Sequence, residues 1–100
     1  MIYIMLLDIK KRALHRSKIL QGQLRGVEKM IEDEVYCMDI ITQSLAIQKS
    51  LASLNKLILE NHLRTHVKDM IGSGDESMQT DSINELLVLY ELTNLRTNNK

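Results

Sequence analysis

Residues 37–70, CMDIITQSLAIQKSLASLNKLILENHLRTHVKDM, contain neither glycine nor proline, and their apolar side chains recur in steps of three and four. This spacing predicts one unbroken helix. A helix that is apolar on two sides packs between neighbours, so we expect it to be the central helix of the fold. One apolar stripe consists of Met38, Ile41, Leu45, Ala52, Leu59, Leu63 and Met70, and the other of Ile47, Leu51, Leu54 and Ile58.

The segments on either side of this stretch also predict helices. Apolar residues recur with the same spacing before it, which predicts a first helix over about residues 6–32, ended by Glu32-Asp33-Glu34. After it, a loop over 72–77 precedes a third helix over about 82–92, whose Ser82-Ile83-Asn84-Glu85 has the pattern of a capping box. The tail from Thr93 is polar, and we expect it to fray. The 100 residues thus predict one all-α domain, 1–100, small enough to gain from oligomerisation.

Gly22 and Gly26 lie inside the first predicted helix, where each costs about 1 kcal/mol relative to alanine. Two glycines four residues apart favour a close approach of another backbone. A surface position that tolerates glycine is the alternative.

Charge is balanced overall but unevenly distributed. The formal net charge is zero, with 13 basic and 13 acidic residues, so the whole molecule has no field that favours nucleic acid or a membrane. Residues 8–29, however, hold seven basic and two acidic side chains. On charge alone, an ordinary solvated helix face explains this basic segment.

The single cysteine, Cys37, excludes a disulfide within the chain and is typical of a reducing compartment. The apolar run at residues 1–7 is too short for a membrane span, and its charges follow it, unlike those of a signal peptide. We therefore expect a cytoplasmic protein that does not bind membranes.

His62 and His66 are four residues apart, so on a helix their imidazoles lie on one face and can bind one metal ion. The second apolar stripe continues onto both, which predicts that they lie at a packed seam. The pattern also occurs by chance, and a pair at the edge of the core is the alternative.

Cys37 cannot join these histidines within one chain. On an unbroken helix, 25 residues separate Cys37 from His62 by about 37 Å. If the three form one site, an antiparallel partner must supply the cysteine, which gives two equivalent sites per two-fold dimer. A thiolate with two imidazoles suits Cu(I), Zn(II) or Ni(II), and low coordination by soft ligands favours Cu(I). Alternatively, Cys37 is simply a small buried residue at a helix start.

Several ordered motifs resemble the CsoR/RcnR family of bacterial metal-responsive repressors. They are residues 15–26, HRSKILQGQLRG, then Met30-Ile31-Glu32, Tyr36-Cys37-Met38-Asp39-Ile40, Gln43, His62-Leu63 and His66. The resemblance implies a three-helix protomer, an antiparallel dimer that forms a four-helix bundle, and a disc-like tetramer. It also implies that the protein is no enzyme: it binds operator DNA and is released when metal binds. A copper chaperone is a candidate partner.

The resemblance assigns the metal ligands to Cys37, His62 and His66. Copper sensors usually have a second cysteine at the third position, where this chain has histidine. Nickel and cobalt sensors use Cys, His and His but add an N-terminal histidine, and the matching position here is about Met5. The chain also lacks the proline of formaldehyde sensors and the second cysteine of persulfide sensors. Cu(I) is therefore the expected metal, with Ni(II), Co(II) or Zn(II) as the alternatives.

The resemblance also suggests which residues surround the metal ligands and which contact DNA. Tyr36 and Glu85 match outer residues that hydrogen-bond the ligands in copper sensors, although Tyr36 has the alternative of a packed ring and Glu85 that of a capping acid. The basic face of the first helix becomes a candidate DNA surface that contacts mainly phosphates. The candidate DNA residues are Arg12, Arg16, Lys18, Gln23, Arg25, Lys49 and Lys56.

Overall fold

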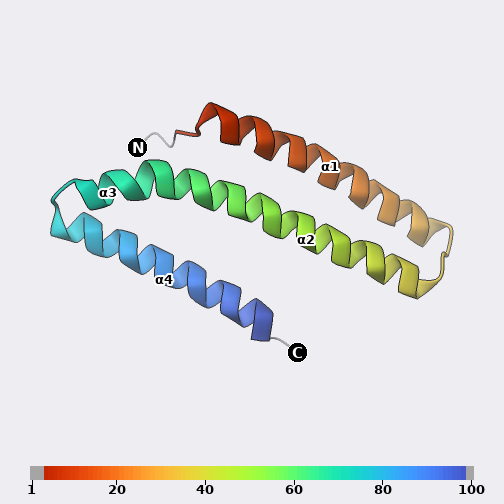
Figure 1. Ribbon diagram of the computed structural model, residues 1–100. Helices are drawn as coiled ribbons and strands as arrows, with labels where there is room; N and C mark the ends of the chain where they lie inside the picture. Colours follow the sequence, from red (N-terminus) through yellow and green to blue (C-terminus); the bar gives the residue numbers. More distant parts are fainter. Residues whose placement is uncertain (1–3, 99–100) are drawn as a thin grey trace. The chain divides into compact units, whose positions relative to one another are not determined.

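The computed structural model describes residues 4–98, and the side chains of residues 4–92. The chain runs through α1 (Leu7–Glu32), α2 (Cys37–His62), a π-helical turn η1 (Leu63–Val67), α3 (Lys68–Gly72) and α4 (Glu76–Asn98), as Figure 1 shows. These residues contain no strand, so the all-α prediction is confirmed. None of the helices over 4–98 has a stretch both long and apolar enough to cross a membrane.

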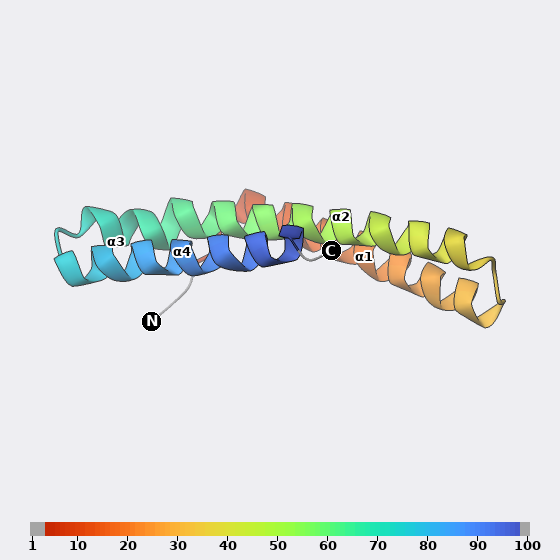
Figure 2. The same ribbon diagram turned by 90° about the horizontal axis from the view of Figure 1, so that it is seen from below.

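The chain divides into two compact units, Met1–Asn61 and His62–Lys100. The N-terminal unit is a helical hairpin of α1 and the part of α2 that ends at Asn61; the two helices lie side by side and antiparallel in both views (Figures 1 and 2). The C-terminal unit contains η1, α3 and α4. The single domain over 1–100 stays a prediction.

The turn between α1 and α2 is closed by backbone hydrogen bonds. The N–H of Glu34 donates to the carbonyl of Ile31 at 3.1 Å, and the N–H of Val35 donates to that of Met30 at 3.0 Å. This is the Schellman arrangement, which requires a left-handed residue after the helix, and Glu34 has φ of 53°. The predicted end of the first helix therefore has a defined hairpin geometry.

The other end of the hairpin is fixed by Asn61. Its Oδ1 accepts the N–H of Leu6 at 2.8 Å, and its Nδ2 donates to the carbonyl of Ile4 at 3.1 Å. Leu6 is the N-cap of α1 and has no side-chain oxygen to serve as a cap. Asn61, only 8% exposed, thus binds the backbone just before α1, and we call this pair of hydrogen bonds the Asn61 clamp.

Only one of the two predicted apolar stripes of α2 has a deeply buried member in the N-terminal unit. Ile47 is buried, but Leu51 and Ile58 of the same stripe are 42% and 39% exposed. Met38, Ile41 and Leu45 of the other stripe are 55%, 49% and 52% exposed. The single chain thus leaves apolar side chains of both stripes exposed, more so in the stripe of Met38, Ile41 and Leu45. The central position that the two stripes predict for this helix stays a prediction.

The C-terminal unit corrects two predicted boundaries. The helix predicted over 37–70 is interrupted by the π-helical turn at Leu63–Val67. The helix predicted over 82–92 begins instead at Glu76, because the Asp75 carboxylate caps it by accepting the N–H of Ser77 at 2.9 Å. The predicted capping box at Ser82 therefore lies inside α4, and the backbone from Thr93 to Asn98 is helical instead of frayed.

Candidate metal centre

The two predicted histidine ligands lie together where α2 passes into η1. His62 is the last residue of α2, and His66 lies in the π-helical turn. Their ring centroids are 5.2 Å apart, with an angle of 34° between the ring planes. Both side chains are half-buried, as the apolar stripe that continues onto them predicts. π-Helical turns occur frequently at functional sites, which makes this pair the strongest candidate for chemistry in the chain.

Glu85 of α4 lies against His62. Its Oε1 contacts Nε2 of His62, an ion pair if the imidazole is protonated. The same nitrogen is buried and makes no aligned hydrogen bond, so the two groups are in close contact without hydrogen-bond geometry. The sequence-predicted outer residue Glu85 is therefore beside a predicted ligand. A carboxylate in this position can orient an imidazole and raise its basicity towards a metal.

Cys37 and Tyr36 lie at the opposite end of α2. Cys37 is its first residue and is exposed, and the ring of Tyr36 before it is 71% exposed. The alternative interpretation of Cys37 as a buried residue is wrong for the single chain. A 26-residue helix is about 39 Å long, so the thiol cannot reach His62 of its own α2.

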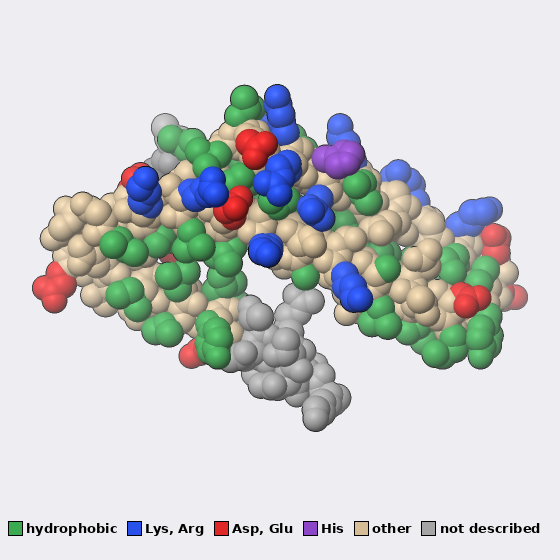
Figure 3. Space-filling view, viewed as in Figure 1, with side chains coloured by type: hydrophobic (Ala, Val, Ile, Leu, Met, Phe, Trp, Pro, Cys, Tyr) green, Lys and Arg blue, Asp and Glu red, His purple; other side chains and the backbone are tan. Residues whose placement is uncertain are grey.

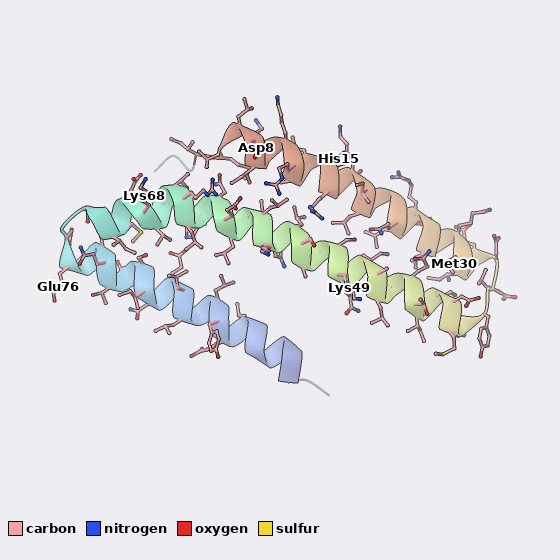
Figure 4. The ribbon with its side chains drawn as sticks, in the orientation of Figure 1. Asp8, His15, Met30, Lys49, Lys68 and Glu76 are labelled. Atoms are coloured by element: carbon pink, nitrogen blue, oxygen red, sulfur yellow. The ribbon has the colours of Figure 1, made fainter. Side chains whose placement is uncertain are left out.

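The donor set fits a metal ion only if two chains share it. Among residues 4–98, no group of three His, Cys, Asp or Glu side chains within the chain is arranged to hold a metal. The chain nevertheless brings two imidazoles together and exposes one thiol, and this combination suits Cu(I), Zn(II) and Ni(II). The remaining histidine, His15, is exposed on α1 and is not part of the pair (Figure 4).

The predicted DNA residues all belong to the N-terminal unit. Six of them are exposed: Arg12, Arg16, Lys18, Arg25, Lys49 and Lys56. Lys and Arg side chains gather along α1 (Figure 3), and Arg12 lies 3.7 Å from the Asp8 carboxylate one turn before it. Gln23 differs, because it is half-buried and its Oε1 makes no hydrogen bond. It lines an open hollow of about 550 Å³ beside Gly22, Gly26 and Gln43.

Two polar residues near the candidate centre are absent from the sequence predictions. Asn61 follows Ile58 by three residues, so a polar residue that continues the spacing of the second apolar stripe was the available signal. Ser82 is fully buried in α4, and the capping-box pattern assigned it to a helix end instead. Both are polar groups that the fold buries, and such groups require an explanation.

Comparison with known proteins identifies similar chains along most of the length. The family model described as "Metal-sensitive transcriptional repressor" matches residues 9–91. The copper-sensing transcriptional repressor CsoR of Bacillus subtilis is 35% identical over 82 residues, covering 82% of this chain and 78% of that protein. The CsoR of Mycobacterium tuberculosis (strain H37Rv) is 43% identical over 56 residues, covering 56% of this chain and 47% of its own length.

A solved structure shares the fold. The crystal structure of the copper-sensing repressor CsoR with Cu(I) from Geobacillus thermodenitrificans NG80-2 superimposes with a TM-score of 0.74 at 31% sequence identity. The match covers 91% of this chain and 94% of that one. The three-helix arrangement expected from the sequence is thereby confirmed.

Proposed function

This chain belongs to the family of metal-sensitive transcriptional repressors, and we propose that it represses transcription in response to Cu(I). Without metal the protein binds operator DNA. Cys37 of one chain and His62 and His66 of another would hold Cu(I) between them, and the metal-loaded protein would release the DNA. Release requires Cu(I) to bind the DNA-incompetent state more tightly than the DNA-bound state.

The observation that carries this proposal is the location of the donors at the start of α2 and at its junction with η1. His62 ends α2 and His66 follows in η1, where the two imidazoles lie together, and the exposed thiol belongs to Cys37, the first residue of α2. Two chains paired antiparallel along α2 would bring each thiol to the other chain's histidines. The open stripe of Met38, Ile41 and Leu45 on α2 supplies an apolar surface for such a pairing. A dimer, doubled into a tetramer, follows from the same family resemblance.

Cu(I) is the metal that the relatives support. The Bacillus subtilis and Mycobacterium tuberculosis relatives are named as copper sensors, and the similar crystal structure contains Cu(I). When bound, Cu(I) would supply a soft Lewis acid that accepts a thiolate and imidazole nitrogens. Glu85 would orient His62, and Tyr36 would lie beside the thiol. Ni(II), Co(II) and Zn(II) are the alternatives, because imidazole at position 66 also suits them.

The exposed cations of the N-terminal unit would contact DNA. Arg16 on α1 is the best single candidate, and Lys49 and Lys56 are exposed on α2. Phosphate contacts release counterions, so DNA affinity should fall steeply as salt concentration rises. A helical storage or interaction protein with the same donors would bind metal but show no such salt-dependent DNA binding.

Anaerobic titration with Cu(I) tests the proposal directly. The probe is a fluorescent duplex from the region upstream of the chain's own coding sequence, and its anisotropy follows binding. We expect DNA affinity to fall at least tenfold with one equivalent of Cu(I) per chain, and not to fall with Ni(II) or Zn(II). Unchanged affinity at saturating copper would contradict copper sensing, and release by Ni(II) alone would favour the alternative metal.

A mixing experiment tests whether the site is shared between chains. Cys37→Ala and His66→Ala each remove one half of every site, so neither variant alone should bind Cu(I) tightly. Their heterodimer regains one of its two sites, and a random equal mixture should therefore recover about a quarter of the wild-type copper capacity. His15→Ala is the matched control, because His15 is exposed on α1. No recovery on mixing would contradict a site that bridges chains.

A further inference from the structure

Ser82 has a buried hydroxyl that the fold does not satisfy. The residue is 0% exposed, and its Oγ makes no hydrogen bond, not even to a carbonyl of its own helix. A buried polar group without a partner is unfavourable, whereas alanine at the same place would carry no such penalty. The need for a small residue in a tight helix contact explains the size of Ser82. It does not explain the hydroxyl.

Two contacts fix what lies opposite Ser82 in the C-terminal unit. Glu85 contacts His62 at one end, and Nε2 of Gln79 donates to the carbonyl of Ile71 at 2.8 Å towards the other. α4 runs antiparallel to η1 and α3 between these points (Figure 1). Ser82 is midway between Gln79 and Glu85.

The residues midway between His62 and Ile71 are His66 and Val67. Val67 is 3% exposed, so the backbone beside it is covered, and His66 is half-buried next to it. The register of the two antiparallel segments thus sets the Ser82 position of α4 across from His66. Glu85, one turn along α4, already contacts the other imidazole of the pair.

We propose that Ser82 is a positioning residue for His66, an inference that rests on the proposed metal-sensing function. Metal-binding histidines nearly always donate the N–H of their second ring nitrogen to an oxygen acceptor, which fixes the tautomer and the ring orientation. For His62, the Glu85 carboxylate that contacts Nε2 is the candidate acceptor. The Ser82 hydroxyl provides the corresponding acceptor for His66 when the imidazole turns to bind metal. α4 then contacts both histidine ligands, one through each of two successive turns.

The variant Ser82→Ala separates this role from a purely structural one. In the metal-free protein it removes an unsatisfied hydroxyl and places a better helix former, so we expect the midpoint of thermal unfolding to stay the same or rise. In the same variant we expect Cu(I) affinity to fall tenfold or more, the usual effect of losing an outer partner of a metal ligand. Ser77→Ala, at an exposed position in the first turn of α4, should change neither quantity.

A double-mutant cycle assigns the effect to His66. In a His66→Ala background, Ser82→Ala should change Cu(I) affinity by less than twofold, because the imidazole that it positions is absent. Nitrogen-15 chemical shifts of the imidazoles give a second readout. On loading with metal, the His66 ring should populate one tautomer in the wild type and a mixture in Ser82→Ala.

The outcomes distinguish this inference from the proposed function. If Cu(I) affinity depends on His66 but Ser82→Ala retains it within twofold, the role of Ser82 is refuted and copper sensing stands. An equal loss of affinity with and without His66 also refutes it, because the effect then does not act through that ring. If wild-type binding does not depend on His66 at all, the proposed site fails together with this inference.

Discussion

Removing the side-chain amide of Asn61 should measurably reduce the free energy that holds the backbone before α1 in place. Asn61→Ala abolishes the hydrogen bonds to the N–H of Leu6 and to the carbonyl of Ile4. Each hydrogen bond contributes about 0.5–1.5 kcal/mol of stability. Because Ile4 is exposed, water can replace part of what is lost, and we expect the variant to lose about 2 kcal/mol of stabilisation in total. That figure corresponds to a roughly thirtyfold faster hydrogen exchange of the Leu6 amide. Exchange followed residue by residue with NMR measures it.

Two further variants make this test specific. Asn55→Ala alters an exposed asparagine of the same helix and should change the free energy of unfolding by less than about 0.5 kcal/mol. Asn61→Asp keeps an oxygen that can accept the N–H of Leu6 but loses the donor to Ile4, so protection at Leu6 should largely persist. If Asn61→Ala left exchange at Leu6 unchanged, the clamp would not hold the start of α1, and the reasoning would be refuted.

Three other changes have expected directions. Glu34→Gly should raise the free energy of unfolding by about 1 kcal/mol in urea denaturation, because Glu34 has φ of 53° at the left-handed position that ends α1. Gly74→Ala should lower it by about 1 kcal/mol, because Gly74 has φ of 77°, and a gain would contradict the turn geometry. Arg16→Ala should reduce the slope of log affinity for DNA against log salt by about one unit, whereas Lys68→Ala on α3 should not, and equal slopes would remove Arg16 from the DNA surface.

The periodicity of apolar residues predicts a helix well where the residues that the chain buries have the same spacing. The first helix was predicted over about 6–32, and α1 covers Leu7–Glu32. Its three buried residues, Ile9, Ala13 and Leu20, have the predicted spacing. The third helix was predicted too short because a capping-box pattern at Ser82 looked like a start. Asp75 caps α4 instead, and a cap depends on which backbone N–H groups lie in reach, which the residue pattern alone does not decide.

The candidate site was predictable in part. The spacing of His62 and His66 placed them on one face, and the rings do lie together. Glu85 was expected near a ligand through the family resemblance, and it contacts His62. The π-helical turn under His66 was not predictable, because residues 63–67 contain no glycine or proline to signal it. The joining of Cys37 to the histidines stays a prediction, since it depends on a second chain.

The proposed contacts of α4 with the two histidines would supply part of the free energy that the response requires. A hundredfold loss of DNA affinity requires Cu(I) to favour the DNA-free state by about 2.7 kcal/mol, whatever the absolute affinity for the metal. A hydrogen bond to a charged group is worth about 1.5–3 kcal/mol, and one between neutral groups about 1 kcal/mol. Glu85 already contacts His62 without metal, so only a strengthening of that contact can add to the difference. A new hydrogen bond between His66 and Ser82 would add about 1 kcal/mol. Loss of the proposed Ser82 contact should therefore weaken the DNA response more than it destabilises the fold, because that contact forms only when metal is bound.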